Sequence, residues 1–310
     1  MILAVSHAGD DHLAPVLEAL ARLGVEARVF DVGDFPARLR LAFAARARVS
    51  AWILDGPDGR AREQDLSAVW WRRPRPVELA PNSTPHDRAL ALRQANATVV
   101  GLWASLRVRW VNEPWADDAA SHKPRQLAAA VRAGLPVPRT LVTNDPDRAR
   151  GFLRGLGRTR AVWKALHCTP EDWYPTRLLG PRSRPDLASL RDAPAILQAY
   201  VPGMDVRVTA VGGRLFAAEI DARRTRSPHD FRPVFDEARV ARCTLPAGIA
   251  RRLRALLADL GLAYAAVDLR RRENGEHVFL EVNPSGQFRF VEERTGLPIT
   301  GALAELLAGR

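Results

Sequence analysis

Apolar and polar positions along the chain follow two periods, which predict a mixed α and β fold. Ile2–Val5 is an apolar run with the length of a buried strand, and residues 11–23 have the apolar spacing of a helix that Gly24 can end. Residues 25–30 return to a strand pattern, so the chain opens as a strand, a helix and a strand. No G-x-G-x-x-G motif lies at the first turn, which argues against a dinucleotide-binding fold.

The rest of the chain alternates between the two patterns without a repeat period. A Pro-containing turn near residues 114–120 predicts a soft domain boundary. The segment from Cys168 to Asp192 is rich in Pro, Arg and Trp and predicts a hairpin or a mobile loop. Further strands are predicted at residues 51–54, 68–71, 140–143, 160–164, 196–201, 206–211 and 214–221, and further helices at residues 85–107 and 246–260 and from Lys123 up to Gly134.

The strongest chemical signal is a hairpin near the carboxyl end of the chain. Asn274-Gly275 is a strong signal for a two-residue type I′ turn, and with that turn Asp268 lies directly opposite Glu281. Asn283 follows two residues after Glu281 and therefore points to the same face. The alternating residues predict an apolar face in the core: Ala265, Val267, Leu269, Val278, Leu280 and Val282.

The three polar side chains of this hairpin suit a hard divalent cation. Two carboxylates directly opposed across a strand pair repel each other, whereas a cation between them removes that penalty. Carboxylate and amide oxygens are suitable Mg²⁺ ligands when nucleotide phosphates complete the coordination shell. The alternative is a solvated polar face on which one carboxylate is protonated or forms a salt bridge.

A second strand pattern carries an acidic and a basic residue on one face. Asp205, Arg207 and Thr209 share this face, while Val206 and Val208 share the other. The planar guanidinium of an Arg on a rigid strand can grip a phosphoryl group, and Asp205 can orient that Arg. The alternative is an ordinary cross-strand ion pair.

The net charge of +11 does not by itself indicate a nucleic-acid-binding protein. Of the 46 basic residues, 44 are Arg, spread along the chain, and only Lys123 and Lys164 are Lys. A drift of composition towards Arg and Ala explains this pattern, and the two retained lysines indicate places where Arg does not fit. A Lys that ends an apolar strand, such as Lys164, needs an anionic partner, which is either phosphate or a nearby Asp or Glu.

Neither a membrane span nor a secretion signal is expected. No apolar run approaches the ~20 residues that cross a bilayer, and MILAVSHAGD lacks the basic start and long apolar stretch of a signal peptide. Cys168 and Cys243 are isolated, which fits neither a disulfide framework nor a zinc site. We therefore expect a protein of the reducing cytoplasm, with no membrane and no nucleic acid as partner.

In chain order, several segments resemble the ATP-grasp superfamily, and more closely the graspetide or microviridin-type maturases that macrocyclise ribosomal peptides. The matching segments are VWWRRPRP, NEPWADDAASHKPRQLAAAVRAGLPVPRTLVT, AVWKAL, ILQAYVPGMDVRVTAVGGRLFAAEID, HDFRP and VDLRRRENGEHVFLEVNPSGQFRFVEERTGLPI. The resemblance implies an α/β (mixed α+β) ATP-grasp fold of three lobes, with the nucleotide between the central and C-terminal lobes. The implied parts are an N-terminal pre-ATP-grasp domain of residues 1–115, a central lobe of residues 116–197 and a C-terminal lobe of residues 198–310.

The same resemblance implies nucleotide-binding roles for individual residues. Lys123 and Lys164 match the two nucleotide-binding lysines, and Gln198, Tyr200 and Val201 match the linker that contacts adenine. Gln198 replaces an acidic residue common elsewhere in the superfamily, and no Gly-rich phosphate-covering loop follows Lys164. In both respects the chain resembles the peptide maturases.

Further implied roles concern the reacting groups. Asp205 and Arg207 match a D-x-R pair near the nucleotide and its phosphates, with Arg207 the best candidate for stabilising transferred phosphoryl charge. Arg232 matches the D-F-R arginine near the reacting carboxylate. Arg72 and Arg73 match a W-x-R-R-P pattern with no assigned role. The residues that match the Mg²⁺ ligands are Asp268, Glu281 and Asn283.

The implied activity is that of a carboxylate ligase that uses ATP and Mg²⁺. A side-chain carboxylate of a precursor peptide becomes an acyl phosphate, and a Ser or Thr hydroxyl or a Lys amine then forms an ω-ester or ω-amide. The resemblance also implies leader docking between Asp172 and Leu190, an acidic core peptide attracted by Arg-rich surfaces, and a homodimer. The alternatives are a RimK-like or glutathione-synthetase-like ligase that adds an amino acid, and a non-enzymatic nucleic-acid-binding protein.

Overall fold

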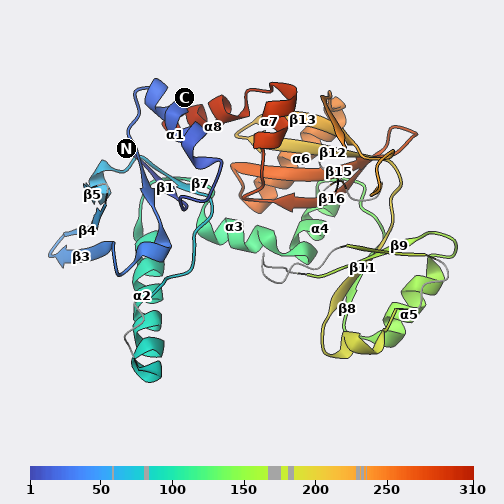
Figure 1. Cartoon of the computed structure of the whole chain (residues 1–310), viewed down its shortest axis with the longest axis horizontal. Helices are drawn as coiled ribbons and strands as arrows, with labels where there is room; N and C mark the ends of the chain where they lie inside the picture. Colours follow the sequence, from blue (N-terminus) through green and yellow to red (C-terminus); the bar gives the residue numbers. More distant parts are fainter. Residues whose placement is uncertain are drawn as a thin grey trace.

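The computed structural model describes residues 1–57, 59–79, 84–166, 176–180, 185–227, 231, 234 and 236–310. Within these residues the strands form four sheets. The N-terminal part of the chain occupies one side of the molecule, and α3 and α4 connect it to the two sheets of the other side (Figure 1).

The N-terminal part is built on a parallel sheet with the strand order β2-β1-β6-β7. The fully buried β1 faces two cores: Ile2 and Ala4 pack with α1 and α8, while Leu3 and Val5 pack with α2. The predicted opening is confirmed, since α1 is followed by Gly24 at a φ of +73°. The elements are β1 (Ile2–Val5), α1 (Leu13–Arg22), β2 (Ala27–Phe30), β6 (Ala68–Trp71), α2 (Pro85–Ser105) and β7 (Arg109–Val111).

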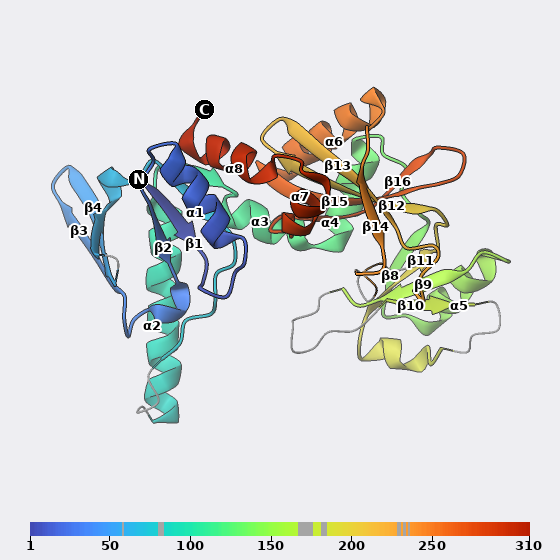
Figure 2. The ribbon, with the colours of Figure 1, turned by 45° about the horizontal axis from the view of Figure 1, so that its top comes forward.

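An antiparallel sheet is inserted between β2 and β6. It has the order β3-β4-β5 and projects from the side of the N-terminal part (Figure 2). Its strands are β3 (Arg40–Arg46), β4 (Val49–Gly56) and β5 (Gly59–Arg62), and short 3₁₀ turns flank it at Val32–Asp34 and Glu63–Asp65.

Two helices lead from the N-terminal part to the remaining sheets. They are α3 (Pro114–Ser121) and α4 (Lys123–Arg132), and Gly134 follows α4 at a φ of +73°. Ala129 and Ala130 of α4 share a core with the C-terminal sheet and with α6 (Ala247–Leu260). The helix α4, which precedes Thr140 in the chain, therefore packs on the C-terminal sheet.

The central sheet is antiparallel, with the strand order β10-β9-β11-β8. The helix α5 covers it and shares a separate small core with it. The elements are β8 (Thr140–Thr143), α5 (Pro146–Gly155), β9 (Ala161–Lys164), β10 (Arg177–Leu179), a 3₁₀ turn at Ala188–Arg191 and β11 (Ala195–Ala199). Much of the predicted hairpin or loop between Cys168 and Asp192 lies outside the described residues, although β10 does pair antiparallel with β9.

The C-terminal sheet is antiparallel, with the strand order β14-β13-β12-β15-β16. Its last helix returns to the N-terminal part, where α8 lies beside α1 (Figure 2). The elements are β12 (Met204–Val211), β13 (Arg214–Asp221), β14 (Arg239–Arg242), β15 (Tyr264–Arg271), β16 (His277–Asn283), α7 (Arg289–Thr295) and α8 (Ile299–Ala308).

The hairpin of β15 and β16 confirms the predicted pairing of Asp268 with Glu281, but not the predicted turn. The turn has three loop residues rather than two, because the Arg272 N–H donates to the Glu276 carbonyl and Gly275 adopts a φ of +85°. A β-bulge between Asp268 and Leu269 then shifts the register by one residue. The extra turn residue and the bulge compensate each other.

The bulge also changes which side chains reach the core. The predicted core face is confirmed for Ala265, Val267, Leu269 and Val282, but it was wrong for Leu280. Phe279, rather than Leu280, lies opposite Leu269 and is fully buried in the core of the C-terminal sheet. Leu280 lines the cavity described below, and Val278 lies opposite Arg270. None of the helices in the described part of the chain is long and apolar enough to cross a membrane.

Candidate active site

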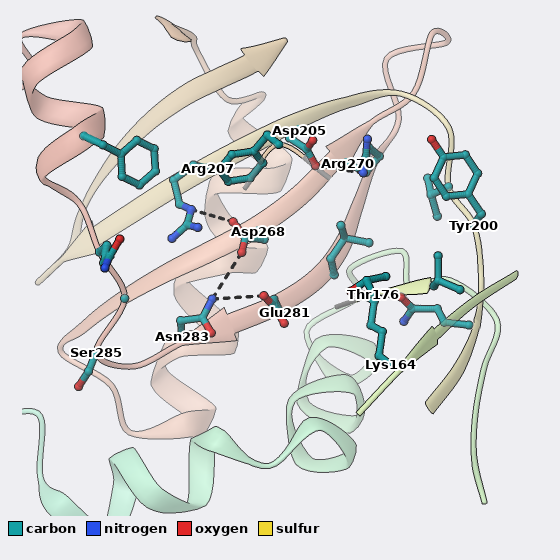
Figure 3. Close-up of a pocket in the computed structure, with 18 of the residues that line it drawn as sticks. Lys164, Thr176, Tyr200, Asp205, Arg207, Asp268, Arg270, Glu281, Asn283 and Ser285 are labelled. Atoms are coloured by element: carbon teal, nitrogen blue, oxygen red, sulfur yellow. Dashed lines mark hydrogen bonds and ion pairs between the residues drawn. The ribbon is translucent and has the colours of Figure 1, made fainter. Parts of the chain in front are cut away.

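A cavity of about 530 Å³ lies between the central and C-terminal sheets. Strands β9 and β11 contribute one wall, strands β12, β15 and β16 contribute another, and the segment after β16 closes an end (Figure 3). The cavity brings together most of the site residues predicted from sequence: Lys164, Gln198, Tyr200, Val201, Asp205, Arg207, Asp268, Glu281 and Asn283.

The three predicted metal ligands converge on one face of the hairpin. The Asn283 Nδ2 lies 3.4 Å from the Asp268 Oδ2 and 3.5 Å from the Glu281 Oε1, so one oxygen of each carboxylate faces the same amide (Figure 3). The oxygen and nitrogen of an amide occupy nearly the same volume. Turning the Asn283 amide over therefore gathers three oxygens, which repel one another unless a cation lies between them.

This donor set fits Mg²⁺, a hard cation that binds carboxylate and amide oxygens and keeps other positions for phosphate and water. The other oxygen of each carboxylate is occupied by a basic side chain. The Arg207 Nε lies 2.8 Å from the Asp268 Oδ1, and the Lys123 Nζ donates to the Glu281 Oε2 at 2.7 Å. Lys123 thus approaches the hairpin from α4, without lining the cavity.

Asp205 forms a cross-strand ion pair with Arg270, as in the alternative that the sequence left open. The register of β12 and β15 places Asp205 opposite Arg270 and Arg207 opposite Asp268. The Arg270 Nη2 lies 3.2 Å from the Asp205 Oδ1, and both side chains are largely buried. Both ion pairs join β12 to β15. The acidic residue lies on β12 in one pair and on β15 in the other, and together the pairs fix all four side chains in the cavity wall.

Arg270 is a cavity residue that sequence reasoning missed. Its Nη1 donates to the Gly203 carbonyl at 3.0 Å, and its guanidinium lies over the Tyr200 ring at 5.9 Å. Arg270 therefore holds the linker between β11 and β12, the segment expected to contact adenine. The signal that could have identified it was the register of β12 on β15, in which positions 205 and 270 oppose each other as 207 and 268 do.

Lys164 ends β9 and reaches across to β11. Its Nζ donates to the Gln198 Oε1 at 3.2 Å, and the Gln198 Nε2 donates to the Thr140 Oγ1 at 2.9 Å. Gln198 is thus held by neighbours on both sides of β11 and presents a neutral partner to Lys164. Arg232, the other predicted catalytic residue, lies outside the described residues, whereas Phe231 before it lines the cavity.

Arg72 ties the N-terminal sheet to the segment after β16. Its Nε lies 3.2 Å from the Asp10 Oδ2, and its Nη1 donates to the carbonyls of Ser285 and Gly286 at 2.6 and 3.0 Å. Burial alone would raise the pKa of Asp10, but hydrogen bonds from His12 and Ser6 and the charge of Arg72 outweigh it and hold that pKa below its usual range. Arg72 is therefore a buried structural residue.

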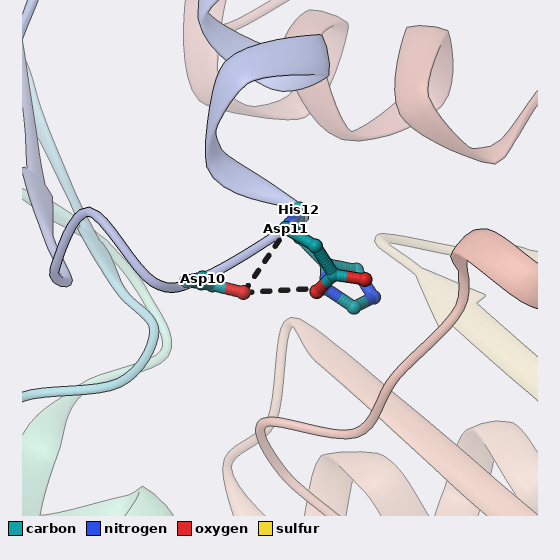
Figure 4. A group of neighbouring side chains, drawn as sticks. All are labelled: Asp10, Asp11 and His12. Atoms are coloured by element: carbon teal, nitrogen blue, oxygen red, sulfur yellow. Dashed lines mark hydrogen bonds and ion pairs between the residues drawn. The ribbon is translucent and has the colours of Figure 1, made fainter.

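Asp10, Asp11 and His12 form a compact cluster of possible metal-binding atoms (Figure 4). The His12 Nδ1 lies 3.2 Å from the Asp10 Oδ1 and 2.7 Å from the Asp11 Oδ1, while its Nε2 accepts from the Phe288 N–H at 3.1 Å. Both ring nitrogens are thus used, with the proton on Nδ1. The hydrogen bonds of this cluster therefore link the N-terminal sheet to the start of α7.

The segment after β16 is also held by residues near α3. The Asn112 side chain accepts from the N–H groups of Ala263 and Tyr264, and it donates to the Tyr264 and Pro284 carbonyls. The Ser285 Oγ donates to Asp117, whose burial raises its pKa to about 6 despite that hydrogen bond. One end of the cavity is therefore fixed by contacts from the N-terminal part.

Known proteins similar to this chain include a ligase solved with Mg and ADP, ligands that the cavity residues fit. Residues 1–118 match the family model of the MvdD pre-ATP grasp domain. The structure of macrocyclase MdnB from Microcystis aeruginosa MRC superposes with a TM-score of 0.82 at 30% identity, covering 99% of this chain and 98% of that one. The ATP-grasp ligase PsnB, solved in complex with minimal precursor, Mg and ADP, has a TM-score of 0.79 at 27% identity, covering 99% and 96%.

A curated relative matches a shorter region. A probable alpha-L-glutamate ligase of Serratia proteamaculans (strain 568) is 29% identical over 206 residues, which are 64% of this chain and 67% of the relative. The chain thus spans about two thirds of that relative, whereas MdnB aligns along almost its whole length. The chain belongs to the ATP-grasp ligases, in the family of macrocyclases that includes MdnB.

Proposed function

We propose that this ligase uses ATP and Mg²⁺ to join side chains within a ribosomally made precursor peptide. The observation that carries the proposal is the cavity wall in which Asp268, Glu281 and Asn283 converge beside Arg207. The cavity has the size of a small-molecule site, and adenine is expected at its Tyr200–Val201 end. When bound there, Mg²⁺ would offset negative charge on the phosphates.

In the first step, an oxygen of a peptide side-chain carboxylate bonds to the γ-phosphorus, and the bond from that phosphorus to ADP breaks. We assign to Arg207 and Lys164 the stabilisation of charge on the transferred phosphoryl group, because both line the cavity. In the second step, a Ser or Thr hydroxyl or a Lys amine bonds to the acyl carbon and phosphate leaves. Each crosslink thus removes one water from the peptide overall, and no enzyme nucleophile is needed.

The peptide partner is part of the same proposal. Solved relatives hold precursor peptides, and the net charge of +11 favours an acidic core peptide. Leader docking is expected between Asp172 and Leu190. We further propose a homodimer that acts in the cytoplasm.

The test is to search the open reading frames beside the gene for a short peptide rich in Thr/Ser and Asp/Glu, and to incubate the purified enzyme with that peptide, ATP and Mg²⁺. Mass spectrometry should show products lighter than the peptide by whole water molecules, with one ADP released per water lost. Omitting Mg²⁺ is the control and should stop both changes. Unchanged peptide mass with no release of ADP would contradict the proposal.

A second candidate function is favoured by the match to the probable alpha-L-glutamate ligase. Such an enzyme uses the same acyl-phosphate chemistry but adds an amino acid to its substrate. The same experiment distinguishes the two, because a product heavier by one amino-acid residue, formed when glutamate is supplied, would replace the loss of water.

A further inference from the structure

Arg73 differs from the other arginines that the structure places in the cavity wall. Arg207 and Arg270 each face a carboxylate of the same wall. Arg73 also lines the cavity, but within the described part of the chain its guanidinium forms no hydrogen bond or ion pair. Its backbone is fixed, because its N–H donates to the Val5 carbonyl at 3.1 Å.

The two carboxylates whose charge acts on Arg73, those of Asp10 and Asp11, already have partners. Asp10 accepts from Ser6, His12 and Arg72, and Asp11 contacts His12. Burial and the adjacent charge of Arg72 lower the pKa of Arg73, and Asp10 and Asp11 oppose this effect only in part. A half-buried cation in this position is stabilised by an anion that enters the cavity.

The position of Arg73 indicates which anion this is. Ser285 and Tyr200 lie at opposite ends of the cavity, with Asp268, Glu281 and Asn283 between them (Figure 3). Arg73 directly follows Arg72, which binds the Ser285 carbonyl. A nucleotide with its base at Tyr200 and its phosphates at the metal-binding residues leaves the Ser285 end for the second substrate.

The fold gives an independent reason to expect a ligand at this place. In the order β2-β1-β6-β7, the chain leaves β1 towards one neighbour and later reaches β6 on the other side. Ligands of open α/β sheets bind at the carboxyl ends of strands where the order reverses in this way. Arg72 and Arg73 follow the carboxyl end of β6 directly.

We propose that Arg73 binds the reacting side-chain carboxylate of the peptide and orients it towards the γ-phosphate. This inference rests on the proposed function. A guanidinium binds a carboxylate through two parallel hydrogen bonds, and its charge offsets the repulsion between the carboxylate and the triphosphate. Arg73 forms and breaks no covalent bond, so its contribution is binding and orientation.

The experiment compares the wild-type enzyme with Arg73→Gln, Arg73→Lys and the control Arg75→Gln. Arg75 lies two residues further on and pairs with Asp31, away from the cavity. Each enzyme receives ATP, Mg²⁺, the peptide encoded beside the gene and hydroxylamine, which traps an acyl phosphate as a hydroxamate. Calorimetry with AMPPNP and Mg²⁺ measures nucleotide binding, and thermal unfolding checks the fold.

Arg73→Gln should lower kcat/KM for hydroxamate formation by about 10- to 100-fold, the range for a lost hydrogen-bonded charge. Its affinity for AMPPNP should equal that of the wild type. Arg73→Lys should retain an intermediate rate, because it keeps the charge without the planar fork. The Arg73→Lys variant also keeps the test decisive if the Arg73→Gln variant does not fold. Arg75→Gln should behave as the wild type.

Two results would overturn the assignment of Arg73. One is an Arg73→Gln enzyme as active as the wild type. The other is a loss of AMPPNP affinity as large as the loss of hydroxamate, which would place the nucleotide phosphates at Arg73. A wild-type enzyme that forms no hydroxamate would overturn the proposed function itself, and the Arg73 proposal with it.

Discussion

At the scale of single residues, each carboxylate of the cavity wall is paired with a basic side chain from a neighbouring element. Asp268 is held by Arg207 from β12, and Glu281 by Lys123 from α4. Each carboxylate still turns its other oxygen towards Asn283. The basic side chains therefore position the acidic ones, which favours a site that needs little rearrangement when its ligands bind.

We expect Asp268→Asn to abolish ADP formation while leaving the fold intact. Even the hydrogen-bonding partners of metal ligands contribute about 10- to 100-fold to metal affinity or activity, so the loss of a ligand should cost more than about 100-fold. Glu281→Gln should have the same effect. A coupled assay for ADP measures the rate, and circular dichroism checks the fold.

The control for this prediction is Glu276→Gln. Glu276 lies on the same hairpin beside the turn and pairs with Arg272 at the surface. That variant should keep wild-type activity. Full activity in either Asp268→Asn or Glu281→Gln would remove the metal assignment.

The residues of the site were predictable from sequence to different degrees. Asp268 and Glu281 lie on one hairpin, so the local turn signal identified the pair, and the bulge offset the extra turn residue that the signal missed. The partner of Asp205 depends on how β12 pairs with β15, which are separated by β13, β14 and α6. No local pattern fixes that register, and Arg270 was therefore missed.

At the scale of elements, the metal-binding hairpin shows how a correct pairing can accompany a wrong turn. Asn-Gly suits a two-residue turn, but it equally supplies a three-residue turn in which Gly275 takes the left-handed conformation. The bulge near Leu280 restores the pairing of Asp268 with Glu281. The core selects this arrangement because it buries Phe279 against Leu269, and that choice depends on packing rather than on sequence period.

Gly275→Ala should destabilise the protein by about 1 kcal/mol, because a residue with a Cβ atom disfavours the left-handed conformation by about that amount. No atom lies within 4 Å of the added Cβ, so the cost is conformational rather than steric. ADP formation should stay at the wild-type rate, since the turn lies beyond the bulge. Urea unfolding measures the change.

Gly213→Ala is the matched control for the turn prediction. Gly213 also has open space around it, but it lacks a positive φ. Its substitution should leave the stability unchanged or raise it slightly, because Ala restricts the unfolded chain. Equal losses of stability in the two variants would show that the left-handed conformation is not the cause.

At the scale of the whole molecule, the N-terminal part and the C-terminal lobe meet at the segment after β16. Arg72 and His12 hold this segment from the N-terminal sheet, and Asn112 and Asp117 hold it from the start of the connecting helices. Its position beside the cavity therefore depends on residues far away in the chain. Such contacts leave no periodic pattern, so the sequence could indicate the W-x-R-R-P motif but not the structural task of Arg72.

Asp117→Asn should stabilise the protein at pH 8. Burial raises the pKa of Asp117 from 3.8 to about 6, so the folded state holds a proton that the unfolded state releases. Stability therefore falls as the pH rises from about 4 to 6, and above that range the charged carboxylate costs up to about 3 kcal/mol. Asn is neutral and has nearly the same shape, and it can still accept the Ser285 hydrogen bond.

Urea unfolding at pH 8 and pH 5 checks this prediction. The advantage of Asp117→Asn should be smaller at pH 5, where Asp117 of the folded protein is mostly protonated. Asp118→Asn is the control, because Asp118 is exposed on the same helix and should change stability little at either pH. A variant less stable than the wild type at pH 8 would contradict the assigned cost.

Arg72 and His12 form hydrogen bonds with the segment after β16, and these bonds limit which parts of such enzymes can be exchanged between relatives. A chimera that grafts only residues 1–118 from a relative would set foreign side chains against the native carbonyls of Ser285 and Gly286 and the native α8. Successful exchange should require residues 284–310 to travel with the graft, so these two stretches are expected to be inherited as one unit.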